Sequence, residues 1–229
     1  MCSSDLGVVI PDVFGDFSSR RVLATSFEEG VPVDSPEVLG LPLERRNAIG
    51  LLFLEVYFRE IFRFGKIQTD PHFGNYRVRL GSAGEPDRLV CLDFGAVRSF
   101  PAKFLRPYFE MLKGVHLRDE VKLDRGAIEL GFLLEDDSVE LKQAFRELCY
   151  LFTEPFGSAN QPYDWGASDL PKRVIQAASE IVWDFKLRAP PREIVFLDRK
   201  LGGVFIFLSK LGVKLDARPV LDRYLETAE

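Results

Sequence analysis

The spacing of apolar residues along the chain predicts a mostly helical protein. The strongest helical pattern runs from Glu44 to Phe64, where residues such as Leu51 and Phe58 leave little polar surface, so this helix should be largely buried. Gly65 follows directly and is a suitable residue to end it. Further helical patterns cover much of the second half of the chain: 107–115, 117–134, 138–152, 172–185 and 193–211.

The last of these predicted helices contains an adjacent pair of glycines, Gly202 and Gly203. A glycine inside a helix costs about 1 kcal/mol relative to alanine, so a pair needs an explanation. Close packing of the helix against a neighbour is the simpler explanation, and contact with a cofactor is the rarer one.

Alternating apolar and polar residues predict two pairs of short strands. In the first pair, Val8–Pro11 and Arg21–Thr25 are joined by a turn at Gly15–Ser19. In the second pair, Tyr76–Leu80 and Arg88–Leu92 are joined by a segment rich in glycine that also contains a proline. The second pair reads as a hairpin that directly follows the buried helix.

Three polar residues at the base of this second hairpin form a candidate site. Asp70 and Asn75 are spaced as Asp-x-x-x-x-Asn just before the hairpin, and Asp93 opens an Asp-Phe-Gly sequence just after it. Phosphoryl transfer from a nucleotide uses an Asp beside the acceptor hydroxyl, then an Asn and a second Asp that bind Mg²⁺. The Asp-x-x-x-x-Asn spacing alone is common and Asp-Phe-Gly alone is scarcer, but their order around a hairpin, behind a buried helix, favours a kinase-like site.

The residues around this site differ from those of a protein kinase that phosphorylates peptides. Few residues separate Gly95 from Pro101, a suitable first residue of a helix that Ser99 could cap, so a phosphorylated activation segment has no room. Gln68 and Thr69 precede Asp70 where such kinases have His-Arg. The pattern therefore favours a small or lipid-like acceptor, or hydrolysis of ATP.

Composition narrows the class further. The chain has 229 residues, is 46% hydrophobic and carries a formal net charge of −5, so it can bury a core but does not suggest a nucleic-acid-binding surface. No apolar run reaches the roughly 18 residues of a membrane span. Cys2, Cys91 and Cys149 show no disulfide or metal spacing, and Cys91 falls in a predicted buried strand, which favours a reducing compartment.

Four segments together resemble the UbiB/AarF/ADCK family of atypical kinase-like proteins, in its ubiquinone-biosynthesis branch. They are VLATSFEEGVPVD, QTDPHFGNY, CLDFGAVR and APPREIVFLDRKLGGVFIFLSKL. The resemblance implies an α+β, mostly helical, protein-kinase-like fold that binds ATP and Mg²⁺ and supports ubiquinone or other polyprenyl quinone synthesis. Phe73, where many relatives have proline, and Gln68, where many have histidine, depart from the common pattern.

The resemblance also assigns roles to individual residues. Asp70 becomes the catalytic-loop Asp, and Asn75 and Asp93 become Mg²⁺ ligands. Ser26 and Phe27 fall at the expected hinge between the lobes, where they would contact the nucleotide.

The lysine of the small lobe, its Glu partner and the family's Lys-x-Gly-Gln motif precede the matching region in relatives and do not occur here. We therefore expect an N-terminally truncated piece. Residues 1–6 would be a non-native start, 7–30 a remnant of small-lobe strands and hinge, and 31–229 the large lobe.

Two alternative functions remain open. Beside the kinase-like function, one alternative is a catalytically silent, pseudokinase-type binding module. The other is a phosphotransferase of the aminoglycoside type, against which the LDRKLGG sequence and the Gln-Thr pair argue. The expected partners are nucleotide, a lipid or quinone-precursor ligand and a membrane surface, with no nucleic acid. The expected location is the cytoplasm, with peripheral attachment to the inner membrane left open.

Overall fold

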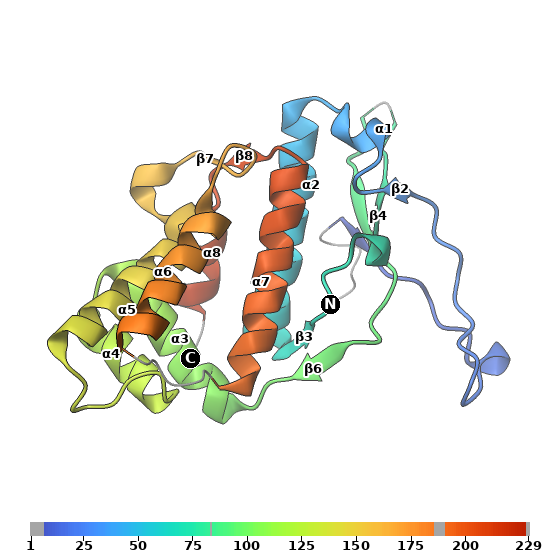
Figure 1. The fold of residues 1–229 in the computed structure, drawn as a ribbon. Coiled ribbons are helices and arrows are strands. Elements are labelled where there is room, and N and C mark those ends of the chain that lie inside the picture. The colour runs from blue at the N-terminus through green and yellow to red at the C-terminus, as the bar shows by residue number, and fades with distance from the viewer. Residues whose placement is uncertain (1–6, 83, 186–190, 228–229) are drawn as a thin grey trace.

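The computed structural model describes residues 7–82, 84–185 and 191–227. A small sheet and an exposed ribbon lie on one side of two long helices, α2 (Leu43–Arg59) and α7 (Arg192–Lys210), and a body of further helices lies on the other (Figure 1). The chain crosses between the two sides along β6 (Val97–Ser99), so the helical body follows the candidate site in sequence.

The main sheet has the strand order β1-β5-β4-β2. Its strands are β1 (Val8–Val9), β2 (Val31–Pro32), β4 (Tyr76–Arg79) and β5 (Arg88–Cys91). Strands β4 and β5 form the predicted hairpin, antiparallel with Tyr76 opposite Cys91. Val78 and Leu89 pair across the hairpin, and both are fully buried. Because one face of the hairpin is buried, apolar and polar residues alternate along it, and this alternation predicted the strands.

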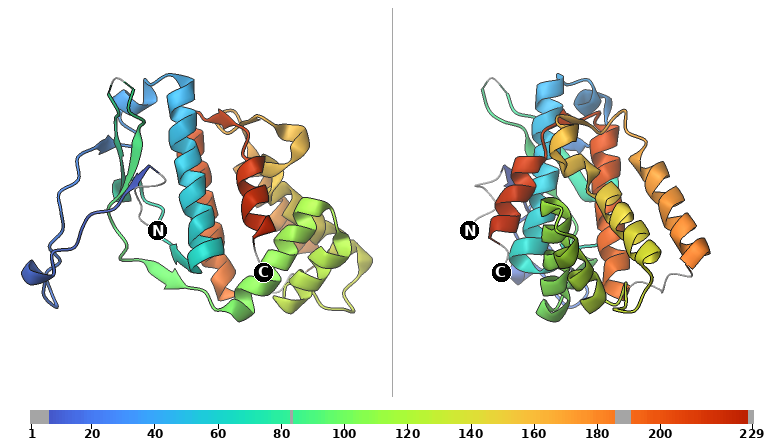
Figure 2. Two further views of the ribbon diagram at one scale, coloured as in Figure 1. Left: turned by 180° about the vertical axis from the view of Figure 1, so that it is seen from behind. Right: turned by 90° about the vertical axis from the view of Figure 1, so that its left-hand side faces the viewer.

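In the first predicted pair of strands, the strand at Val8 is confirmed in part as β1, but the second strand and the pairing of the two are wrong. β1 pairs in parallel with β5, with Val8 opposite Leu89, and Arg21–Thr25 forms no strand. Residues 10–30 instead form an exposed ribbon, held by the isolated bridges Val13–Thr25 and Ser19–Val22, that extends away from the rest of the molecule (Figure 2). No apolar layer covers this ribbon, since Leu23 is 72% exposed, and a strand pattern without a surface to pack on is not stabilised.

Helix α2 (Leu43–Arg59) confirms the predicted buried helix and continues into a π-helical turn, η3 (Glu60–Phe64). Gly65 ends this turn in the left-handed conformation, with φ of 56°, which a residue with a side chain rarely adopts. Helix α7 (Arg192–Lys210) packs alongside α2, and the rings of Phe53 and Phe207 stack with centroids 4.6 Å apart.

The helical body beyond α7 contains α3 (Ala102–Leu117), α4 (Glu120–Glu129), α5 (Val139–Phe152), α6 (Leu170–Phe185) and α8 (Arg218–Glu226). Ser138 caps α5 as predicted, by accepting a hydrogen bond from the backbone N–H of Leu141. The helix predicted to begin at Leu117 begins at Glu120, because Arg118 is left-handed and Asp119 provides the cap.

Three smaller features were not predicted or were predicted wrongly. Ser99 does not cap a helix but lies in β6, which pairs with β3 (Lys66–Gln68). Short helix α8 and the two-residue strands β7 (Tyr163–Asp164) and β8 (Lys214–Leu215) were not expected. Across the described ranges, none of the helices combines the length and the apolarity needed to cross a membrane.

Candidate functional site

The segment between β3 and β4 is a tight loop that joins Asp70 to Asn75. The loop turns through backbone hydrogen bonds from His72 N to Asp70 O (2.9 Å) and from Asn75 N to His72 O (3.0 Å). The Asn75 side-chain amide then donates to the Asp70 backbone oxygen (3.0 Å) and to Asp70 Oδ2 (3.2 Å). The Asp-x-x-x-x-Asn spacing therefore closes the loop on itself and brings the two side chains together.

Asp93 lies beside this loop because of the hairpin. The backbone N–H of Leu92 donates to Asn75 O at 2.9 Å, which places the next residue, Asp93, next to Asn75. From the other side, Thr69 donates twice to Ala96 O, through its backbone N–H (3.1 Å) and its hydroxyl (2.8 Å). Asp70, Asn75 and Asp93 are thus held on two neighbouring loops, as the sequence predicted.

Asn75 and Asp93 offer oxygen atoms, which are the ligands that a hard cation such as Mg²⁺ prefers. The Asn75 amide nitrogen is bound to Asp70, which leaves its side-chain oxygen as the free acceptor. Asp93 accepts from Gly95 N–H through Oδ1 (2.7 Å), and its Oδ2 has no hydrogen bond within the described ranges. Mg²⁺ prefers oxygen ligands and keeps several waters, so an amide and a carboxylate suffice beside the phosphates of a nucleotide. In the described parts of the chain, His, Cys, Asp and Glu form no cluster of three.

Helix α7 contacts the loop through two residues, Arg199 and Gly203, that sequence reasoning did not place there. Arg199 Nη2 lies 3.0 Å from Asp70 Oδ1, an ion pair between residues far apart in the sequence. Gly203 lies against the loop so closely that a Cβ built on it would be 2.0 Å from Pro71 Cβ. The only sequence signal was the unusual glycine pair, and close packing, the simpler of its two explanations, holds for Gly203. Gly202 faces open space.

Lys200 is buried beneath the loop, with 3% of its surface exposed. Its Nζ atom lies 3.1 Å from Glu60 Oε2 and donates to the Tyr76 hydroxyl at 3.1 Å. Burial raises the pKa of Glu60, and the charge of Lys200 only partly opposes this. Burial lowers the pKa of Lys200, but Glu60 and Tyr76 more than compensate, so that pKa is raised and the ammonium stays charged. This group fixes α7 to the π-helical turn and to the first residue of β4.

The structure places Ser26 and Phe27 in the exposed ribbon. The Ser26 hydroxyl accepts from Asp12 N–H (2.9 Å) and donates to Glu28 Oε1 (2.6 Å), so both of these bonds stay within the ribbon. Phe27 is 90% exposed. Their role as nucleotide contacts at a hinge stays a prediction, whereas Asp70, Asn75 and Asp93 are brought together.

The chain resembles known proteins over nearly its whole length. It is 34% identical to the atypical kinase coq-8, mitochondrial, of Caenorhabditis elegans over 209 residues, which is 89% of this chain and 26% of that protein. It is 32% identical to the atypical kinase COQ8B, mitochondrial, of Danio rerio over 217 residues, 94% of this chain and 34% of that protein. The chain therefore spans about a quarter to a third of the length of these relatives.

Fold comparison agrees with the sequence comparison. The structure of Rv3197 from Mycobacterium tuberculosis, solved as a complex with erythromycin, matches with a TM-score of 0.63 and 19% identity over 94% of this chain and 52% of that one. At this identity the likeness concerns the fold, which is α+β and kinase-like. The model of the ABC1 atypical kinase-like domain matches residues 1–126, which include the loop from Asp70 to Asn75 and Asp93. The chain belongs to the ABC1 atypical kinase-like family.

Proposed function

We propose that this chain carries the metal-binding and catalytic part of an ATP-dependent atypical kinase that supports ubiquinone or related polyprenyl quinone metabolism. The observation that carries the catalytic part is the closed loop in which Asn75 donates to Asp70 while its backbone oxygen accepts from Leu92, beside Asp93. The quinone assignment rests on the family resemblance, and it includes peripheral contact with a membrane and a lipid or quinone-precursor ligand.

Each residue has a distinct task in this proposal. Asn75, through its amide oxygen, and Asp93 hold Mg²⁺, whose charge stabilises the phosphates of bound ATP. Asp70 lies beside the acceptor, a hydroxyl group or a water, and accepts its proton. Arg199 forms an ion pair with Oδ1 of Asp70, and the side-chain amide of Asn75 donates a hydrogen bond to Oδ2. The Asp70 carboxylate is therefore oriented before substrate binds.

The short segment after Asp93 supports a small acceptor or plain ATP hydrolysis. Residues Val97–Ser99 form β6 and pair with β3, so the chain returns at once to the base of the catalytic loop. A peptide substrate of a protein kinase lies against a long activation segment at this point. The aminoglycoside-type phosphotransferase has no observation in its favour. A silent binding module would use the same residues to bind nucleotide, and it would differ from the proposed enzyme only in not turning over ATP.

A chain extended at its N-terminus to the length of the relatives tests the metal site. Asp93→Asn replaces a carboxylate with a neutral amide, so Mg²⁺-dependent ATP binding and turnover should fall at least about tenfold. Asp136→Asn, an exposed carboxylate far along the chain, is the matched control and should change neither.

Two other outcomes have clear meanings. ATP turnover that survives both Asp93→Asn and Asn75→Ala would show that the metal site is elsewhere. Tight Mg-ATP binding by the unmodified extended chain, with no turnover, would favour the silent binding module.

A further inference from the structure

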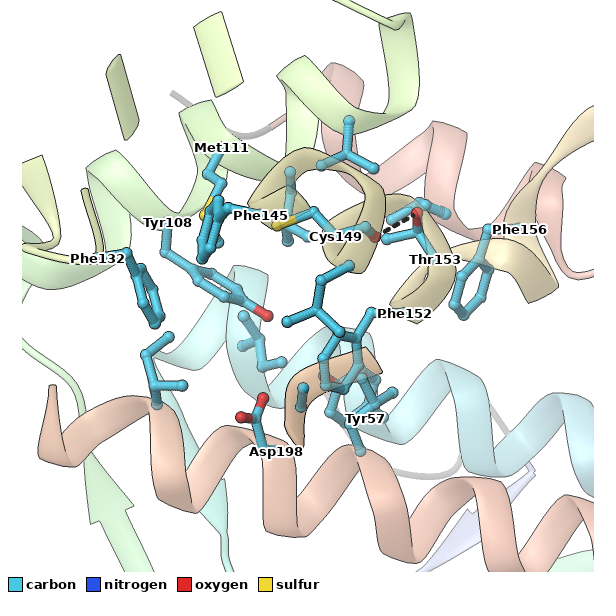
Figure 3. Close-up of a pocket in the computed structure, with 18 of the residues that line it drawn as sticks. Tyr57, Tyr108, Met111, Phe132, Phe145, Cys149, Phe152, Thr153, Phe156 and Asp198 are labelled. Carbon is cyan, nitrogen blue, oxygen red and sulfur yellow. Dashed lines mark hydrogen bonds between the residues drawn. The ribbon is translucent and has the colours of Figure 1, made fainter. Parts of the chain in front are cut away.

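An apolar cavity of about 290 Å³ lies inside the helical body, between α2, α3, α5, α6 and α7 (Figure 3). Aromatic side chains form much of its wall, among them Tyr57, Tyr108, Phe132, Phe145 and Phe152. None of the three proposed catalytic and metal-binding residues lines it. Its size is close to the lower end of the range for small-molecule sites, which are mostly apolar with a few placed polar groups.

Among the described residues that line the cavity, Asp198 of α7 is the only charged one. Its carboxylate points into the cavity (Figure 3), and within the described residues it has no hydrogen bond or ion pair. Burial raises the pKa of Asp198 to about 6. A carboxylate surrounded by apolar atoms is costly when ionised, unless a positive or hydrogen-bonding partner reaches it.

Within the described residues, the other polar groups of the cavity wall make no hydrogen bond to Asp198. The hydroxyls of Tyr57 on α2 and Tyr108 on α3 hydrogen-bond to each other, and burial raises the pKa of both. Burial also raises the pKa of the Cys149 thiol on α5 to about 12. Helix α6 presents Ala178 and Val182. All these groups are neutral between pH 4 and 8, so Asp198 alone changes charge in the cavity over this range.

We propose that this cavity is a binding site for a small apolar molecule that carries an amine. The aliphatic or aromatic part of such a molecule would replace water along the apolar wall. Its ammonium group would make a charge-assisted hydrogen bond to Asp198, and the faces of the surrounding aromatic rings also favour a cation. The site is separate from the nucleotide site, and the proposal does not depend on ATP binding.

Calorimetric titration of the 229-residue chain with n-octylamine and n-octanol, both below their micelle concentrations, tests this. The two probes have the same apolar chain and differ in charge. At pH 8, where Asp198 is ionised, the amine should bind about ten- to a hundredfold more tightly than the alcohol, the range of a hydrogen bond to a charged group. At pH 4.5 the amine is still charged but Asp198 is protonated, so this preference should disappear.

The variant Asp198→Asn should bind amine and alcohol equally at pH 8. Asp136→Asn changes an exposed residue that does not line the cavity, so it should keep the preference. Circular dichroism confirms that each variant is folded, and the pH series on the unmodified chain needs no variant. Equal binding of the two probes at pH 8, a preference that survives Asp198→Asn, or no binding of either probe would overturn the proposal.

Discussion

Asp198 is a carboxylate in the wall of the cavity, and its side chain is exposed to molecules the size of water. The protein atoms packed around it nevertheless raise its pKa from 3.8 to about 6. The folded protein therefore binds a proton at Asp198 more tightly than the unfolded chain does. Between about pH 4 and pH 6 the folded state carries more protons at this residue, so its contribution to stability falls as the pH rises.

This predicts a pH-dependent gain in stability for Asp198→Asn. Near pH 4 the variant and the parent should be about equally stable, because the parent carboxyl is protonated. Above about pH 6.5 the variant should be more stable by on the order of 1 kcal/mol, a figure reduced from the full shift because the cavity admits water. Urea unfolding at several pH values measures the difference, and a difference that does not vary with pH would contradict the assigned shift.

Arg199 orients Asp70 rather than touching the reacting groups, and we predict that its loss affects turnover more than binding. Both side chains are partly exposed, so their ion pair contributes about 1 kcal/mol or less. In the extended chain, Arg199→Ala should lower kcat by up to about fivefold while KM for ATP changes little. Arg199→Lys should restore part of the loss. A raised KM with unchanged kcat would instead place Arg199 in nucleotide binding.

At the scale of single elements, α7 is the helix that positions the catalytic loop. Lys200 joins it to η3 and β4, Arg199 joins it to Asp70, and Gly203 lets it approach Pro71. Replacing either Lys200 or Glu60 alone should destabilise the fold, because the charge of the other residue would stay buried without a partner. The approach at Gly203 depends on the absence of a side chain.

The two adjacent glycines of α7 give a matched test of that approach. Gly203→Ala would place a Cβ 2.0 Å from Pro71 Cβ, which forces the loop and the helix apart, so unfolding should become easier by about 1–3 kcal/mol. Gly202→Ala meets open space and should stabilise the helix by up to about 1 kcal/mol. Denaturant unfolding measures the free energy of unfolding of both variants. Equal changes in that free energy would contradict the close contact between Gly203 and Pro71.

The elements that sequence reasoning predicted are those whose pattern is local. The hairpin β4–β5 and the helix α2 show their burial in consecutive residues, and the Asp-x-x-x-x-Asn spacing makes the contact between Asp70 and Asn75 a short-range one. The contacts of α7 join residues more than a hundred positions apart, and no local pattern predicts them. The strand expected at Arg21–Thr25 was wrong because its alternation has no surface to pack on.

At the scale of the whole molecule, the candidate site is supported by the hairpin β4–β5 and by α7. Kinase sites hold the α- and β-phosphates with a lysine and a glycine-rich loop, and the large lobe supplies metal ligands and the acceptor side. The first lysine of this chain is Lys66, in β3, and the described residues before α2 form no strand longer than the two-residue strands β1 and β2.

We therefore predict that the 229-residue chain alone binds Mg-ATP feebly and shows no measurable ATP hydrolysis. Mg²⁺ gives up its water reluctantly and binds weakly to a few protein ligands unless the phosphates are themselves held. Calorimetric titration with Mg-ATP measures this, and circular dichroism confirms that the chain is folded. Micromolar affinity would show that the described loops hold the nucleotide without further support.

The neighbouring positions of Asp198 and Arg199 on α7 link two places that are otherwise separate. One residue lines the cavity and the next holds Asp70, so a movement of this helix changes both at once. Linkage between two binding equilibria is reciprocal: if occupancy of the cavity favours one position of α7, the affinity at the catalytic loop changes by a factor, and loop ligands change the affinity of the cavity by the same factor. Under that condition, the adjacent contacts of Asp198 and Arg199 on one helix couple binding in the cavity to binding at the loop that contains Asp70.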